Sequence, residues 1–146
     1  MMDAALSWYQ NTALASTVGS SPTLTAMLSA LHALGFTFVM GGALFANLGR
    51  LGVLFPGRPV RDLTIPGSKL IALGLAFSLP TGLMLVAPRA TAAGHNTFFG
   101  LKMLFLVLAA AVQFGLLRRD TRAIGAAGLA LWLGLAAAAC AFILLE

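Results

Sequence analysis

Four apolar runs, each long enough to cross a lipid bilayer, constrain this chain more than any other feature. They cover residues 24–48, 65–86, 97–117 and 123–145, and about 20 apolar residues suffice for a transmembrane helix. Inside a bilayer the protein itself must pair every backbone N–H and C=O, so such runs form helices. Only 9% of the residues are charged, against about 25% in soluble domains. We therefore expect an all-α membrane protein, a bundle of four transmembrane helices in one domain over residues 1–146.

The N-terminal segment, residues 3–19, is too polar to span a membrane. It sets Trp8 and Tyr9 among Ser, Asn, Gln and Thr side chains, and these two aromatic types favour the headgroup level. We expect a short interfacial helix here, with a frayed chain end as the alternative. A secretory signal is not indicated, because the segment lacks a positively charged start.

Proline-containing segments separate the first runs. Residues 56–59 end the first run and residues 87–89 end the second, while residues 90–96 and 118–122 have the composition of loops. Pro80 lies inside the second run and has no amide hydrogen to donate to the preceding turn. We therefore expect a kink in the second helix near this proline.

Lys and Arg side chains collect in two of the three connections. The first connection and its flanks hold Arg50, Arg58, Arg61 and Lys69. The last connection holds Arg118, Arg119 and Arg122. The middle connection has only Arg89, and the N-terminal segment has none. Because cytoplasmic loops carry the excess of positive charge, we expect the two basic connections in the cytoplasm and both termini outside. Charges dispersed in this way form no patch for nucleic acid.

His32 is the one histidine inside a predicted span. It lies about eight residues from the outer start of the first helix, which is ~12 Å at 1.5 Å per residue. An ionisable side chain at membrane depth is costly and marks a functional site by default. Imidazole is a common ligand of haem and of metals. The alternative is a hydrogen bond that holds two helices together.

Lys102 and His95 are the other candidates in the outer half of the bundle. Lys102 lies about five residues, ~8 Å, inside the third helix. There it could pair with a haem propionate or an anionic substrate, ligate iron, or extend to the headgroups. His95 lies at the outer mouth of that helix. It could be a second axial ligand, a proton relay or an ordinary exposed histidine.

Polar side chains share faces of the first and third predicted helices. At 100° per residue, Lys102 and Gln113 fall on one stripe of the third helix. The corresponding stripe of the first helix holds Ser29, His32, Phe36, Val39, Ala43 and Arg50, with Asn47 close to it. Such faces are expected to point into the bundle rather than toward lipid.

Several kinds of chemistry have no support in the sequence. Cys140 is the only cysteine, and no paired cysteines, or histidines four apart, could hold a metal. No nucleophile has a plausible base nearby, which argues against hydrolytic chemistry. Met27, Met40, Met84 and Met103 lack the close spacing typical of copper sites, so we expect them to pack between helices.

The fourth run is rich in small residues. Ala130, Gly134 and Ala138 recur at intervals of four, and such a face lets helix backbones approach closely. It would suit a homodimer in the bilayer or packing inside the bundle.

The spans also carry short motifs with a family resemblance. Ala-Leu-His at 30–32 is followed by Gly41-Gly42 and Arg50, and the third span opens with Phe-Phe-Gly-Leu-Lys-Met-Leu at 98–104. This pattern resembles a group of small bacterial four-helix membrane proteins, which implies a location in the bacterial inner membrane. The group includes uncharacterised domain families, the membrane domain of CopD-type copper-resistance proteins, and HemJ-type protoporphyrinogen oxidases. The chain looks most like the uncharacterised branch.

The resemblance implies a b-type haem in the bundle, with His32 as an axial ligand of the iron and Lys102 as the matching functional lysine. The second axial position is left open among His95, Lys102, a methionine and none. The expected function is electron transfer in the outer half of the bundle, with a quinone or a redox protein as partner. The alternatives are a non-redox subunit or small transporter for an ion, copper or an organic anion, and a HemJ-like oxidase.

Overall fold

The computed structural model describes residues 2–115 and 121–144, and all regular structure in them is helical. The elements are α1 Met2–Gln10, α2 Ala13–Ser20, α3 Pro22–Leu51, α4 Arg61–Val86, the 3₁₀ turn η1 Ala87–Arg89, α5 Ala90–His95, α6 Thr97–Ala110, the π-helical turn η2 Ala111–Gly115, and α7 Arg122–Leu144. Four stretches are long and apolar enough to cross a membrane: Pro22–Leu51, Arg61–His95, Thr97–Gly115 and Arg122–Leu144. The predicted all-α bundle of four transmembrane helices is confirmed.

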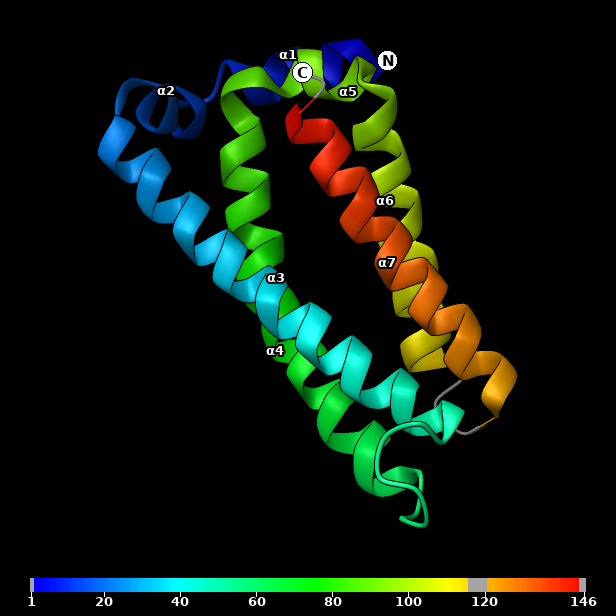
Figure 1. Ribbon diagram of the computed structural model, residues 1–146. Coiled ribbons are helices and arrows are strands. Elements are labelled where there is room, and N and C mark those ends of the chain that lie inside the picture. The colour runs from blue at the N-terminus through cyan, green and yellow to red at the C-terminus, as the bar shows by residue number, and fades with distance from the viewer. Residues whose placement is uncertain (1, 116–120, 145–146) are drawn as a thin grey trace.

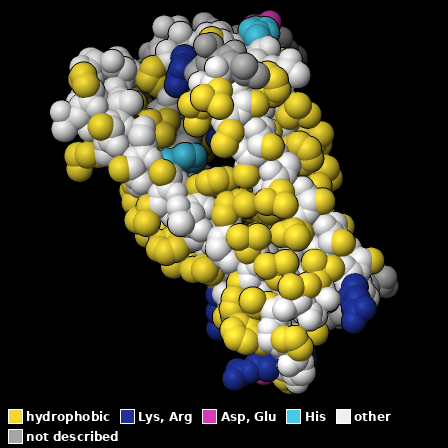
Figure 2. Space-filling view, in the orientation of Figure 1, with side chains coloured by type: hydrophobic (Ala, Val, Ile, Leu, Met, Phe, Trp, Pro, Cys, Tyr) yellow, Lys and Arg dark blue, Asp and Glu magenta, His cyan; other side chains and the backbone are white. Residues whose placement is uncertain are grey.

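The molecule has two distinct ends (Figure 1). At the first, here termed the cap end, α1, α2 and α5 lie across the ends of the spans, near the end of α7. At the second, termed the basic end, the turn between α3 and α4 lies near the start of α7. On the face shown in Figure 2, Lys and Arg side chains gather mainly at the basic end.

Local sequence signals set the limits of α3. The Ser21 hydroxyl caps its start by accepting the Leu24 amide at 3.3 Å, and Pro22 follows in the first turn. At the other end Gly52 has a φ of 75°, a left-handed conformation that glycine adopts without a steric cost. These signals give a helix of 30 residues, longer than a bilayer crossing needs.

Glycines at seven-residue intervals bring α3 and α4 into backbone contact. Gly35 and Gly42 of α3 face Gly74 and Gly67 of α4. A Cβ on Gly42 would lie 2.6 Å from the Gly67 carbonyl oxygen, and one on Gly74 would lie 2.5 Å from that of Gly35. No side chain fits at such distances, so these glycines allow α3 and α4 to pack as one tight pair.

The other two spans, α6 and α7, form a second pair, and α7 also packs against α3. The Phe99 and Phe142 rings meet across this pair with centroids 5.6 Å apart. A buried apolar core joins the two pairs and consists of Val39, Ala43, Ile71, Ala109, Trp132 and Leu135. Toward the cap end α3 separates from α4, and α2 packs against both of them (Figure 1).

The small-residue face of α7 is partly used inside the bundle. A Cβ on Gly134 would lie 2.9 Å from the Phe105 ring of α6, and Ala138 is buried. Ala130 is exposed. Of this face, one residue is therefore fully open to an external partner.

Two segments differ from the sequence-based expectation. Residues 3–19 form two helices rather than one, because the Thr12 hydroxyl accepts the Ala15 amide and starts α2. Residues 90–95, expected in a loop, form α5. Arg50 lies beyond the expected end of the first helix at residue 48, yet it belongs to α3 and is only 2% exposed, in agreement with its predicted place on the inward stripe.

Two further expectations concern helix continuity and the last connection. α4 stays helical through Pro80, and the Thr81 hydroxyl donates to the Phe77 carbonyl at 2.6 Å in this turn. The third span passes from α6 into the π-helical turn η2. The expected end of that span at residue 117, and Arg118 and Arg119 of the last connection, lie outside the described residues.

Candidate functional site

His32 is held in one orientation by α4. Its Nδ1 lies 2.9 Å from the Ser78 carbonyl oxygen and 3.2 Å from the Thr81 hydroxyl oxygen. A carbonyl oxygen only accepts, so Nδ1 carries the proton and donates it. In the neutral ring Nε2 then has the lone pair. Among the described residues, nothing forms a hydrogen bond with Nε2.

Close packing of α3 on α4 makes this orientation possible. The Ser78 hydroxyl returns a hydrogen bond to the His32 carbonyl at 3.5 Å. Gly82 lies directly beside the ring, where a Cβ would be 2.9 Å from His32 Cε1. A side chain at position 82 would therefore displace the imidazole.

A cavity of about 260 Å³ opens beside His32 between the two helix pairs. All four spans contribute to its wall, which consists of His32, Phe36, Val39, Leu75, Ser78, Leu79, Gly82, Leu83, Val86, Phe99, Lys102, Met103, Leu106 and Leu135. The wall is apolar except for His32, Ser78 and Lys102. The surface is visibly hollowed in the half nearer the cap end (Figure 2).

Lys102 reaches the same cavity from α6. Its side chain is half-buried, and no described residue forms a hydrogen bond or an ion pair with its ammonium group. The structure thus brings together His32 and Lys102, which are 70 positions apart in the chain. The result is an apolar cavity with one free imidazole nitrogen and one free cation.

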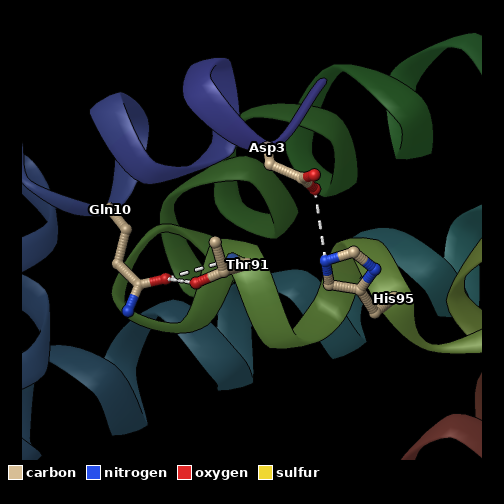
Figure 3. Close-up of polar contacts among 4 residues, drawn as sticks. All are labelled: Asp3, Gln10, Thr91 and His95. Carbon is tan, nitrogen blue, oxygen red and sulfur yellow. Dashed lines mark hydrogen bonds and ion pairs between the residues drawn. The ribbon is translucent and has the colours of Figure 1, made fainter. Parts of the chain in front are cut away.

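His95 is not part of this cavity. It lies at the end of α5, where its Nε2 is 3.2 Å from an Asp3 carboxylate oxygen, and both side chains are largely exposed, at 64% and 72%. Beside this pair, the Gln10 side-chain oxygen accepts from both the amide and the hydroxyl of Thr91 (Figure 3). These contacts fasten α1 to α5 at the cap end.

Of the four methionines considered as ligands, Met103 lines the cavity. Met40 packs against the apolar core as expected, whereas Met27 is 66% exposed, so the expected packing between helices is wrong for Met27. Within residues 2–115 and 121–144, no group of three or more His, Cys, Asp or Glu side chains could hold a metal ion. A protein-only metal centre is therefore not formed by the described side chains.

A second polar cluster lies buried nearer the basic end, and the sequence alone did not identify it. Gln113 Oε1 accepts from Asn47 Nδ2 at 3.4 Å and from Arg50 NH1 at 3.3 Å. Gln113 Nε2 donates to the Ser68 hydroxyl at 2.8 Å. We term Asn47, Arg50, Ser68 and Gln113 the amide network. It ties α3, α4 and η2 together.

The sequence held one signal of the amide network. Asn47 and Arg50 lie near the inward stripe of α3, and Gln113 lies on the inward stripe of the third span. Their contact depends on how far along its axis each helix is placed, which a single-sequence pattern does not give. Comparisons of the chain with protein-family models, with curated proteins and with solved structures find no match.

Proposed function

We propose that this protein binds haem b in the cavity between its helix pairs and serves electron transfer in the bacterial inner membrane. The observation that carries the proposal is the state of His32. Its Nδ1 donates to a backbone carbonyl and its Nε2 is free. Histidines that bind metals are commonly oriented by such a hydrogen bond, which fixes the tautomer and raises the basicity of the ligating nitrogen.

The cavity suits the chemistry of a porphyrin in part. Its apolar wall matches the macrocycle, and iron in a porphyrin needs only one or two protein ligands, so the lack of a three-residue metal cluster is no obstacle. Its volume of about 260 Å³ is below the roughly 300–1,000 Å³ of usual ligand pockets. Haem binding therefore requires the helices around the cavity to move apart.

The other polar groups have defined roles in this proposal. Lys102 would pair with a propionate, and its positive charge would favour the reduced iron. Met103 and Lys102 both line the cavity and stay candidates for a second ligand, whereas His95 is engaged with Asp3 at the cap end. The bound haem would supply one-electron chemistry, and a quinone or a redox protein would exchange electrons with it.

The charge distribution supports an orientation for the proposed protein. Arg58, Arg61 and Arg122 belong to the basic end, while Arg89 is the only Lys or Arg of α1, α2, η1 and α5. The positive-inside rule then places the basic end in the cytoplasm. Both termini and the cavity would belong to the outer half of the membrane.

An absorption spectrum of the detergent-purified protein tests the proposal. We expect a Soret band after expression with added haem precursor, and its loss in His32→Ala. His95→Ala is the matched control and should keep the band, since its ring is outside the cavity. Protein that stays colourless with haem supplied would refute the proposal.

One observation favours a second candidate function, a carrier or binding subunit for a lipophilic anion. The cavity is small, and Lys102 has no acidic partner among the described residues. A compact organic anion would fill this space without separating the helix pairs. Uptake of such an anion into liposomes by colourless protein, abolished in Lys102→Gln, would support this candidate over haem binding.

A further inference from the structure

A second groove lies nearer the basic end, between α4 and the π-helical turn η2. It is shallow and open, with a volume of about 270 Å³, and its wall consists of Ile65, Ser68, Lys69, Ala72 and Phe114. Three of these residues are apolar and none is acidic. The groove belongs to the membrane-spanning part of the chain, so a bilayer lipid is its natural neighbour.

Two polar groups in the groove have unused hydrogen-bonding capacity. Lys69 is exposed, and the described residues offer its ammonium group neither an acid nor another acceptor. Ser68 is only 7% exposed and its hydroxyl oxygen accepts from Gln113. Its own proton has no acceptor in the described part of the chain, which is uncommon for a buried hydroxyl.

The spacing of these residues matches the shape of a lipid. Lys69 lies eight residues after Arg61, the start of α4, or ~12 Å along the helix axis. Ile65, Lys69 and Ala72 are four and three residues apart, so they lie along one face of α4. A flexible lysine here can extend toward the headgroups while its stem stays on the apolar surface. The apolar wall between Ile65 and Phe114 can then contact an acyl chain.

We propose that this groove binds an anionic phospholipid of the membrane leaflet at the basic end. The phosphate accepts from the Lys69 ammonium group, and one acyl chain lies in the groove against Ile65, Ala72 and Phe114. Charge complementarity selects the lipid class. The wall of the groove contains the positively charged Lys69 and no acidic residue, and Arg58, Arg61 and Arg122 lie at the same end of the molecule. A zwitterionic headgroup would bring a second cation to this site.

Native mass spectrometry of the detergent-purified full chain tests the proposal. The protein is titrated with phosphatidylglycerol and, separately, with phosphatidylcholine. We expect wild type to bind phosphatidylglycerol about fivefold more tightly, the effect of one lysine near a lipid surface, and Lys69→Gln to lose this preference. Lys102→Gln, the matched lysine variant in the other cavity, should keep it.

A second variant tests the acyl-chain contact. Ile65 is 47% exposed, so Ile65→Trp fills the groove without disturbing the core, and it should weaken phosphatidylglycerol binding. Inorganic phosphate at the same concentration should not displace the lipid. An unchanged preference in Lys69→Gln, equal binding of the two lipids by wild type, or displacement by phosphate would each overturn the proposal.

Discussion

The two halves of this bundle use buried polar groups in opposite ways. Nearer the basic end, the Gln113 side-chain oxygen accepts hydrogen bonds from Asn47 and Arg50, and its nitrogen donates one to Ser68. Nearer the cap end, His32 has one nitrogen engaged and the other free beside a cavity. Gln113 joins α3, α4 and η2 through hydrogen bonds of both its side-chain oxygen and its nitrogen, whereas the free His32 nitrogen is available to a ligand.

The largest effect is expected where helix backbones touch. Gly42→Ala puts a methyl group 2.6 Å from the Gly67 carbonyl oxygen, and neither backbone can yield without separating α3 from α4. We expect unfolding in detergent to become easier by about 2–3 kcal/mol, as for overpacked cores. Thermal unfolding followed by circular dichroism measures it.

Gly100→Ala is the matched control for that change. A Cβ there would meet nothing within 4 Å. The free energy of unfolding of this variant should rise by up to about 1 kcal/mol, because alanine has a better helix propensity than glycine. Equal melting temperatures for the two variants would mean that α3 and α4 are not packed as closely as described.

A smaller effect is expected from breaking the amide network. Gln113→Leu leaves Asn47, Arg50 and Ser68 each without one buried partner. We expect the free energy of unfolding to fall by about 2 kcal/mol, because a buried polar group left without a hydrogen-bond partner is not compensated for its desolvation. Gln10→Leu removes the same amide from the half-exposed surface at the cap end and should cost under about 1 kcal/mol. If Gln10→Leu lowers the free energy of unfolding more than Gln113→Leu does, the contrast drawn between the two halves is wrong.

The smallest effect is expected at the surface of the cap end. Asp3 and His95 are 72% and 64% exposed, and exposed ion pairs contribute about 0–1 kcal/mol before salt screening. Asp3→Ala should lower stability by less than about 0.5 kcal/mol, and added salt should remove even that difference. A larger loss, measured by melting at low and high salt, would show that this pair holds α1 in place.

Hydropathy alone located the four spans, because crossing a bilayer requires a long apolar helix whatever its neighbours are. The depth of His32 and Lys102 followed from counting residues from the helix starts, and depth was enough to place both at one level. Length and polarity are local properties, so a single sequence carries them.

The parts that could not be predicted depend on contacts between distant segments. Residues 90–95 look like a loop by composition, yet they form a helix against which α1 packs through Gln10 and Thr91. Arg50 falls on the inward stripe of the first predicted helix, but the sequence does not indicate that Asn47 and Gln113 are its partners inside the bundle. Such pairings depend on the relative heights of helices, which hydropathy does not encode.

The seven-residue glycine spacing has a consequence for proton placement. Sliding α4 along α3 by one turn would put Leu63 and Leu70, or Ile71 and Ser78, where Gly67 and Gly74 now lie, and the backbones could not stay in contact. The glycines therefore fix the axial register of the pair and with it the height at which His32 meets the Ser78 carbonyl. Residues that never touch the imidazole thus determine which of its nitrogens is protonated.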